Sequence, residues 1–359
     1  MPNLRTARAR VLAAVLAPAL LALAACGGNS AAGGSSGSGT APELRLGYFA
    51  NLTHAAALIG VNKGDFTKEL GSTKLTTQVF NAGPDEVEAL FAGALDAAYI
   101  GPCPTVNAYG QSKGDAIRIV AGAASGGAEL VVRDGITTAA DLKGKKLATP
   151  QLGNTQDVAL RTWLTGQGLK NSVTGGGDVT VAPTANSDVL NLFKAGKLDG
   201  AWVPEPYASR LVLEGKGHVL VDERDLWPAG KFVTTHLVVR TEFLKKYPET
   251  VAALLRGHVA AVQYAQQDPA GAKSAINAAL TASGSKALDQ ATIDRAWSEM
   301  TVTYDPIASA LKKSAENGVT AGTTEKAVDL KGIYDLTPLN KILTAQKLAP
   351  VSAGGLGVE

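Results

Sequence analysis

The chain has 359 residues, enough for more than one lobe, and 45% of them are hydrophobic, enough to build a buried core. Its formal net charge is +2, and removing Arg5, Arg8 and Arg10 near the start leaves −1, so no basic stripe remains to bind nucleic acid. Cys26 and Cys103 are the only cysteines. With Cys26 assigned to another role below, we expect folding without a disulfide, and the four scattered histidines give no metal-ligand spacing.

The first 25 residues have the pattern of a signal peptide. After the arginines comes an apolar run of 15 residues, Val11 to Ala25, which is shorter than the roughly 20 residues of a membrane-spanning helix. The segment Leu23-Ala24-Ala25-Cys26 resembles the lipobox of bacterial lipoproteins, which implies cleavage before Cys26 and a lipid on that cysteine. Residues 27–41 contain six Gly, four Ser and no charge, which is typical of a flexible linker. We therefore predict a signal peptide at 1–25, a linker at 26–42 and a folded body from about Glu43.

From residue 44 to 240, short β-type runs alternate with amphipathic stretches, and Gly, Pro and Asn separate them. The predicted strands are Leu44–Tyr48, Leu75–Phe80, Ala97–Ile100, Ile117–Ala121, Lys146–Thr149, Val179–Ala182, Ala201–Val203, Val219–Val221 and His236–Arg240. The predicted helices are Ala55–Asn62, Asp85–Phe91, Thr105–Gln111, Thr155–Thr165, Asp188–Lys194 and Pro206–Glu214. The alternation predicts an α/β architecture.

From Tyr247 onward the pattern becomes almost purely helical. The predicted helices are Glu249–Gln267, Pro269–Ala282, Asp289–Met300, Pro306–Asn317 and Pro338–Gln346. Several begin with Pro or Asp, which the first turn of a helix favours. We expect these helices to buttress one lobe.

Two segments 103 residues apart resemble each other. Residues 92–99 read Ala-Gly-Ala-Leu-Asp-Ala-Ala-Tyr, and residues 195–202 read Ala-Gly-Lys-Leu-Asp-Gly-Ala-Trp. Each copy leads into a proline-containing loop at the carboxyl end of a predicted strand, where ligands bind in open α/β sheets. The spacing is too long for a solenoid repeat, so we interpret it as one unit used once in each of two lobes.

Polar, glycine and aromatic residues follow several predicted strands and open helices. Helix starts bind anions through their free backbone N–H groups and dipole, and aromatic rings can cover an organic tail. The candidate ligand-binding residues are Asn51, Thr53, His54, Gly101, Pro102, Cys103, Gly126, Gly127, Gln151, Gly153, Asn154, Thr155, Gln156, Trp202, Glu205, Tyr207 and Thr235, and Tyr99 is a further aromatic candidate beside these loops.

The same segments resemble a known family. Residues 46–54, 101–104, 149–161, 202–206 and 232–239 are similar to the sulfonate, taurine and nitrate group of ABC-transporter substrate-binding proteins, and residues 149–161 are most similar to its aliphatic-sulfonate-binding members. The resemblance implies a type II periplasmic-binding-protein fold, with two α/β lobes joined by two crossing segments and a helical C-terminal region on lobe one. It places residues 43–133 and 238–359 in lobe one and residues 134–237 in lobe two, with hinges near Val132 and Leu237.

The resemblance also implies a function. The chain is expected to bind a small organic anion, first of all an aliphatic sulfonate, between its lobes and to deliver it to an ABC permease and its ATPase. It is expected to be a monomer without a cofactor or a metal, anchored by lipid on Cys26 to the outer face of the cell membrane. Such anchoring, with the Ala- and Gly-rich composition, suggests a high-GC Gram-positive bacterium.

Several alternatives stay open at this point. Taurine, nitrate, bicarbonate or a vitamin precursor would suit the same fold, and Glu205 beside an anion site would suit an amine-bearing ligand. The candidate loops contain no Lys or Arg, and Arg161, the nearest cation, is expected to be a solvated helix residue. A distant alternative is an enzyme that uses Cys103 as a nucleophile, because a helix start favours a thiolate.

Overall fold

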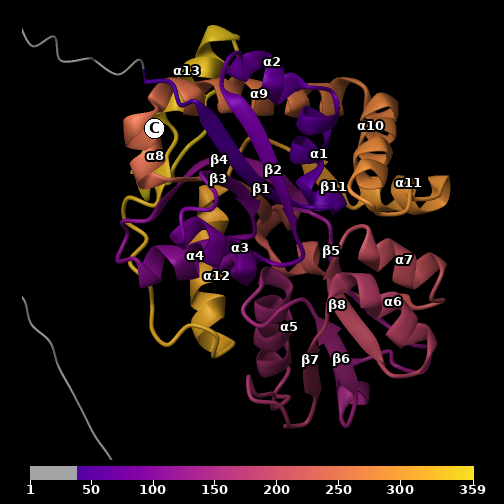
Figure 1. Cartoon of the computed structure of the whole chain (residues 1–359). Helices are drawn as coiled ribbons and strands as arrows, with labels where there is room; N and C mark the ends of the chain where they lie inside the picture. The colour runs from indigo at the N-terminus through magenta and orange to yellow at the C-terminus, as the bar shows by residue number, and fades with distance from the viewer. Residues whose placement is uncertain (1–38) are drawn as a thin grey trace, which may run out of the picture. The chain divides into compact units, whose positions relative to one another are not determined.

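Two β-sheets form the framework of residues 39–359, the part of the chain that the computed structural model describes (Figure 1). The predicted signal peptide, Cys26 and the linker as far as residue 38 lie outside the described residues. The first sheet has eight strands in the order β13-β12-β4-β10-β3-β1-β2, with β11 paired to β4. The second has five strands in the order β7-β6-β8-β5-β9. The predicted α/β class is confirmed.

The strands of the first sheet come from both ends of the described chain. In its centre β1 lies parallel to β2 and β3, while β10 lies antiparallel to β3 and β4. Their bounds are β1 Glu43–Phe49, β2 Lys74–Phe80, β3 Ala97–Ile100, β4 Ile117–Gly126, β10 Val233–Arg240, β11 Met300–Val302, β12 Tyr334–Asp335 and β13 Gly357–Val358. The prediction of an almost purely helical region after Tyr247 is wrong for β11, β12 and β13, which are too short to show a strand period.

The strands of the second sheet follow one another in the middle of the chain. Here β6 lies parallel to β7 and β8, and β5 lies antiparallel to β8 and β9. Their bounds are β5 Ala128–Val132, β6 Lys146–Thr149, β7 Thr180–Pro183, β8 Gly200–Pro204 and β9 His218–Asp222. The sequence did not predict β5. Its residues are all buried, and a short apolar run of this kind does not alternate in polarity.

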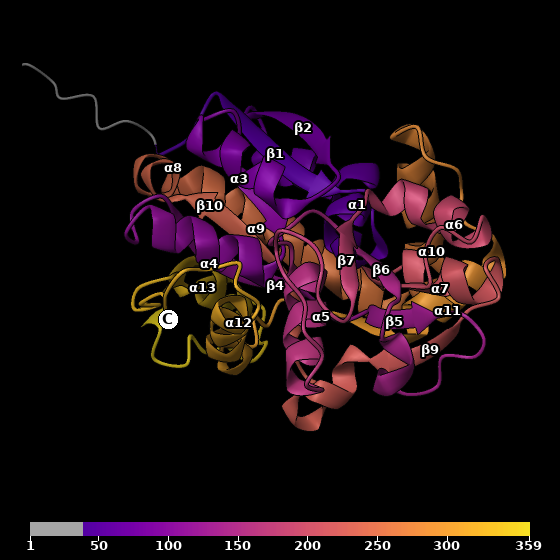
Figure 2. The same cartoon turned by 90° about the horizontal axis from the view of Figure 1, so that it is seen from below.

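Helices cover both faces of each sheet, as Figure 1 shows for the first. Their bounds are α1 Ala55–Asn62, α2 Asp65–Leu70, α3 Gly83–Phe91, α4 Pro102–Gln111, α5 Thr155–Gly166, α6 Asn186–Lys194, α7 Tyr207–Leu213, α8 Thr241–Lys246, α9 Pro248–Gln267, α10 Pro269–Ala282, α11 Gln290–Ser298, α12 Ala308–Thr320 and α13 Thr337–Ala345. Short 3-10 helices lie at Leu52–His54 (η1), Ala139–Leu142 (η2), Glu223–Leu226 (η3) and Pro228–Gly230 (η4). Figure 2 shows α12 beside α4 and α5, with which it packs.

Alternating side chains of the central strands build two cores around the first sheet. In β3, Ala97 and Tyr99 pack with α1, α9 and α10, whereas Ala98 and Ile100 pack with α3, α4 and α12. In β10, Leu237 and Val239 face the first core and Val238 faces the second. This two-residue period makes both faces apolar and requires helices on both.

The chain passes between the sheets at two places. It leaves the first sheet after β4 and enters the second with β5, so the first crossing is at Gly127. It returns between β9 and β10 through η3 and η4. Residues 128–132 therefore belong to the second sheet and residues 233–237 to the first. Both crossings thus lie a few residues closer to the N-terminus than the predicted hinges. The division into two moving lobes stays a prediction.

The described body begins slightly before Glu43. The Ala41 N–H donates to Thr250 Oγ1 at 2.7 Å, and the Ala41 carbonyl accepts from Thr73 Oγ1 at 2.6 Å, so the end of the predicted linker is fixed to the body. Between residues 39 and 359, no helix combines the length and the hydropathy that crossing a bilayer requires.

Candidate ligand-binding site

The predicted segments meet where the two sheets adjoin. The Leu52 N–H donates to the Glu205 carbonyl at 3.1 Å, and the Glu205 N–H donates to the Gly127 carbonyl at 2.9 Å. The loop after β1, the first crossing and the end of β8 are thereby joined by backbone hydrogen bonds. A Cβ at Gly127 would lie 3.3 Å from the Thr53 methyl and 3.8 Å from Glu205 Cγ, so both side chains border this crossing.

The helix start at Gly101 and the helix start at Asn154 face each other. A Cβ at Gly101 would occupy the place of the Thr155 hydroxyl, so only glycine permits this approach between α4 and α5. Neither N-cap residue, Gly101 or Asn154, makes a side-chain capping hydrogen bond. In α4 the Cys103 N–H is the free first-turn donor, because Pro102 and Pro104 have no N–H and the Thr105 N–H donates to the Gly101 carbonyl. The first turn of α5 adds its own N–H groups, and the positive ends of both helix dipoles lie here.

Two buried hydroxyls near this place have no hydrogen-bond partner among residues 39–359. They belong to Thr155, which is 6% exposed, and to Thr235, which is fully buried. The neighbouring Thr234 hydroxyl does have a partner, because it donates to the Gly126 carbonyl at 2.5 Å. A buried hydroxyl without a partner costs about 1–3 kcal/mol, so these two are the donors that a bound molecule would satisfy.

Asp157 holds the loop that precedes α5. Its carboxylate accepts from Thr149 Oγ1 at 2.8 Å, from the Gly153 N–H at 3.0 Å and from Arg161 Nε at 3.0 Å. Arg161 is fully buried and also donates to the Ser172 carbonyl at 2.7 Å. The prediction of a solvated Arg161 is wrong. The guanidinium is one helical turn from Asp157, and this i, i+4 pair draws it inward.

Three amide side chains of this loop contact protein groups. Gln151 Nε2 donates to Asp85 Oδ1 at 2.9 Å, and Asn154 Oδ1 accepts from the Gly83 N–H at 3.2 Å. Asn154 Nδ2 donates to Gln156 Oε1 at 3.3 Å. Gln151 and Asn154 therefore join the second-sheet part to the start of α3, and they close the region around Thr155 from one side.

His54 is buried and neutral. Its Nδ1 accepts from the Phe49 N–H at 3.1 Å, and its ring stacks on Phe49 with the centroids 4.3 Å apart. Burial lowers the pKa of His54 to about 3, and with Nδ1 as acceptor the proton is on Nε2. His54 thus closes the turn after β1 and supplies no positive charge. Asn51 is buried in the same turn without capping η1.

Two of the three aromatic candidates belong to the core. Trp202 is fully buried and donates from Nε1 to Glu223 Oε2 at 2.8 Å, and the Tyr99 hydroxyl is 2.8 Å from His258 Nδ1. Neither ring is free to cover a ligand, because each residue lies within a β-strand and its ring packs against a layer of helices. Tyr207 alone lines a cavity of about 520 Å³, together with Ala50 and the segment between α10 and α11.

Cys103 lies in an apolar contact with Val158 and Ala321. Burial raises the pKa of its thiol, and the negative charge of Glu223 adds to the effect. The expectation that the helix start would favour a thiolate is therefore wrong, because desolvation outweighs the helix dipole. Pro102 occupies the first helical position of α4, as proline prefers.

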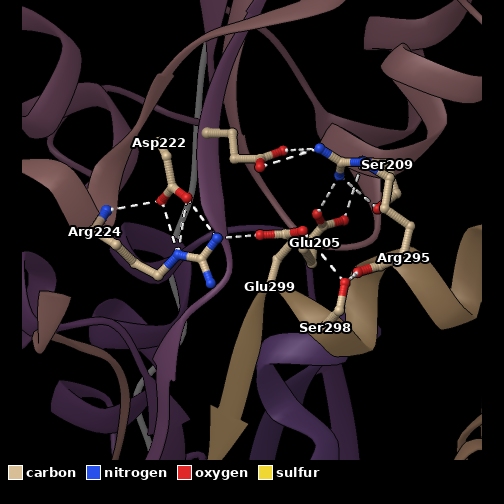
Figure 3. Close-up of polar contacts among 8 residues, drawn as sticks. Glu205, Ser209, Asp222, Arg224, Arg295, Ser298 and Glu299 are labelled. Carbon is tan, nitrogen blue, oxygen red and sulfur yellow. Dashed lines mark hydrogen bonds and ion pairs between the residues drawn. The ribbon is translucent and has the colours of Figure 1, made fainter.

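Glu205 is fully buried but it is not alone (Figure 3). Its Oε1 is 2.9 Å from Arg295 Nη1 and its Oε2 accepts from the Ser209 N–H at 3.0 Å. Arg295 Nη2 also bonds the Glu129 carboxylate at 2.7 Å. Burial, and next the charge of Glu129, raises the pKa of Glu205 to about 7.

No sequence pattern pointed to Arg295. It lies in α11, 90 residues after Glu205, in a segment that carries no motif. A second group, Asp222, Arg224 and Glu299, lies beside it in Figure 3, with Arg224 2.5 Å from Asp222 and also paired with Glu299. Carboxylate oxygens of Glu129, Asp222 and Glu299 approach within 4.8 Å of one another, but each of these residues is paired with an arginine.

A cavity of about 340 Å³, lined by both apolar and polar side chains, begins at Pro104 and Gly153. It is lined by one face of α3, one face of α4, the loop at Leu152 and Gly153, and Val173. Phe91, Leu152 and Val173 are among its lining residues and are 44, 41 and 38% exposed, although they are large hydrophobic side chains. Pro104 and Gly153 connect this cavity to the loops around Thr155.

Comparison with known proteins identifies the relatives of this chain. Residues 37–280 match the model of the NMT1-like family. A provisionally named binding protein of Brucella abortus is 31% identical over 215 residues, which are 59% of this chain and 63% of that relative. A provisionally named aliphatic-sulfonates-binding protein of Bacillus subtilis is 26% identical over 341 residues, 92% of this chain and 96% of the relative. The chain thus matches less than two thirds of the Brucella protein.

The fold is similar to that of solved binding proteins. The alkanesulfonate-binding protein SsuA from Xanthomonas axonopodis pv. citri, bound to MOPS, has a TM-score of 0.66 to this chain at 21% identity, covering 80% of this chain and 96% of the other. At that identity the likeness shows the fold alone, and it confirms the predicted periplasmic-binding-protein architecture. The chain belongs to the NMT1-like family, and its predicted resemblance to the sulfonate, taurine and nitrate group of substrate-binding proteins is confirmed.

Proposed function

We propose that the chain is the extracytoplasmic binding component of an ABC importer and that it binds a small organic anion, first of all an aliphatic sulfonate, where the two sheets adjoin. The observation that carries this proposal is the pair of buried, unpartnered hydroxyls of Thr155 and Thr235 beside two uncapped helix starts. A sulfonate has three acceptor oxygens and one negative charge. It would accept from these hydroxyls, from the Cys103 N–H of α4 and from the N–H groups at the start of α5.

The apolar part of the cavity along α3 and α4 supports an anion with an organic part. A bare nitrate or bicarbonate would leave Phe91, Leu152 and Val173 without a contact, whereas an alkyl or aryl tail would bury part of their surface. Taurine and a vitamin precursor remain alternatives within the same fold. They are distinguished by an amine or a ring, and the ligand panel below tests the amine with taurine.

Binding without catalysis is the favoured mode of action. Cys103, the one nucleophile candidate, has a raised thiol pKa and apolar neighbours, so it lacks the ionised form that attacks a substrate. The named relatives given above are binding proteins, which supports the same view. Delivery to a permease and its ATPase is the step that such a protein would serve.

The ligand class is tested by calorimetry and thermal shift on the purified full chain. The panel contains ethanesulfonate, octanesulfonate, taurine, nitrate, sulfate and a phosphonate. We expect saturable stabilisation by the sulfonates, rising with ligand concentration as mass action requires. A T155V/T235V variant removes both hydroxyls and keeps the side-chain volume, so it should lose most of the affinity. Stabilisation by another class with no response to any sulfonate would overturn the proposal.

Export and lipid anchoring complete the proposed role. The predicted signal peptide and Cys26 lie outside the described residues, and the pattern of the sequence is their support. A tether keeps a binding protein near its permease at a raised effective concentration. We expect Cys26→Ser to release the chain into the medium while its affinity stays unchanged. Fractionation of cells that produce the two forms checks this, and equal retention at the membrane would contradict it.

A further inference from the structure

The Glu205 side chain borders the first crossing between the sheets, beside the loop after β1 that carries the candidate residue Thr53. Its Cγ and the Thr53 methyl both lie within 4 Å of a Cβ built at Gly127, and its carbonyl accepts from Leu52 in the loop after β1. A second buried carboxylate, that of Glu129, lies in β5, the strand that follows Gly127. Negative charge on either carboxylate would repel an anion and favour an amine, because charges inside a protein act over several ångströms.

Arg295 is positioned to reduce this repulsion, because its one positive charge pairs with both carboxylates. One guanidinium nitrogen bonds Glu205 Oε1 and Ser209 Oγ, both at 2.9 Å, and the other bonds both oxygens of Glu129 at 2.7 and 3.1 Å. Figure 3 shows the guanidinium between these groups, reaching from α11 toward the second sheet. The Asp289 side chain caps α11 through the Thr292 N–H, which fixes the start of the helix. Arg295 is itself 20% exposed, so the ion pairs are largely shielded from water.

The neighbouring charges also consist of one arginine and two carboxylates. Arg224 pairs with Asp222 and Glu299, and Ser298 donates to Glu299. Arg295 therefore has no guanidinium neighbour that could replace it in pairing with Glu205 and Glu129. Removing it would leave two buried carboxylates with the N–H of Ser209 as the remaining donor to Glu205.

We propose that Arg295, supplied by the C-terminal helices, is the specificity-determining residue that makes this site accept anions in preference to amine-bearing zwitterions. It acts through Glu205 and Glu129 and not through contact with the ligand, so it is a positioning residue. This inference rests on the proposed function and deepens it, because it assigns the ligand a net negative charge and disfavours taurine against a simple alkanesulfonate.

The test is the ratio of affinities within matched ligand pairs, measured by calorimetry on the purified full chain. Ethanesulfonate is paired with taurine, and propionate with β-alanine. In the unchanged protein the anion should bind more tightly. R295M should lower the anion-to-zwitterion ratio by about tenfold or more, and E205Q should raise it. R295K keeps the charge and should restore most of the ratio.

The controls separate charge from folding. Lys273 of α10 pairs with Asp294 of α11, so K273M removes one cation of similar exposure from the same helical region. Its pair does not involve Glu205 or Glu129, so its ratio should stay unchanged. E205Q is isosteric and keeps the inference testable if R295M folds poorly. Ratios that are equal in all variants would overturn the inference.

The same experiment distinguishes failure of the proposed function. Binding of the carboxylate pair without binding of either sulfonate would exclude sulfonates as the ligand class. The affinity ratio for the carboxylate pair would still measure the effect of Arg295. Absence of binding by both pairs would count against the proposed function and against the inference together.

Discussion

At the scale of single residues, buried charge is the feature that decides most about this protein. Glu205 has Arg295 and Ser209 as partners, whereas Glu86 has none. The Glu86 side chain, on α3, is fully buried against Gly47 and Leu95. Neither of its carboxylate oxygens has a hydrogen-bond partner among the described residues. Burial therefore raises the pKa of Glu86 well above its usual range.

This pKa shift predicts how stability depends on pH. The folded state keeps a proton on Glu86 that the unfolded chain releases above the ordinary pKa of glutamate, so this residue lowers the free energy of unfolding progressively as pH rises. E86Q should remove that part of the slope and should stabilise the protein at pH 8 by at least about 1 kcal/mol, the value of one pKa unit. Urea unfolding at pH 5 and pH 8 measures it.

The matched control is Glu88, an exposed glutamate on the same helix. E88Q should leave the dependence of the free energy of unfolding on pH as it is in the unchanged protein. Parallel slopes for E86Q and the unchanged protein would mean that Glu86 is ionised in the folded state and has a partner there.

At the scale of elements, the loop before α5 is the part whose shape the site depends on. The Gly153 N–H of this loop donates to the Asp157 carboxylate, and the side chains of the loop form hydrogen bonds with the start of α3. Because Asp157 and Arg161 are both buried, breaking their pair would leave an uncompensated charge inside the protein.

D157A should therefore lower the free energy of unfolding by about 3–5 kcal/mol, the usual effect of removing one partner of a buried ion pair. Arg210 and Glu214 in α7 form an i, i+4 pair of the same kind that is about one third exposed, and E214A should cost about 0–1 kcal/mol. Urea unfolding of the two variants compares them. Equal losses would show that the Asp157 pair is as well solvated as the surface pair.

At the scale of the whole described body, hydrogen bonds join the two sheet-bearing parts near the candidate site, in addition to the ion pairs of Arg295 with Glu129 and Glu205. Gln151 bonds Asp85, Asn154 bonds the Gly83 backbone, and Leu52 bonds the Glu205 backbone. Such contacts are readily exchanged for contacts with water. They suit a protein whose predicted lobes open to admit a ligand.

Ligand should therefore shift the population toward the closed arrangement. We expect the radius of gyration from small-angle X-ray scattering to be smaller in saturating ligand than without it. Q151A removes the contact with Asp85 and should weaken ligand affinity without changing the ligand-bound radius. Calorimetric binding without any change in radius would contradict a closing movement.

What the sequence by itself determined is the set of features that local pattern encodes. The strand and helix periods gave the α/β class and most elements, because a buried face repeats every two residues in a strand and about every 3.6 in a helix. Gly101, Thr155 and Thr235 could be predicted as site candidates from their residue types at strand ends, since helix starts and close approaches need glycine or a hydroxyl at fixed positions.

Only the tertiary structure decided which of these residues are free to bind. Trp202 and Tyr99 are aromatic residues of the kind that can cover a ligand, but both are buried by packing against a layer of helices. The pairing of Glu205 with Arg295 joins residues 90 positions apart, and no local period carries information about such a distant partner. The charge of the candidate site therefore became known only when the fold placed α11 beside the end of β8.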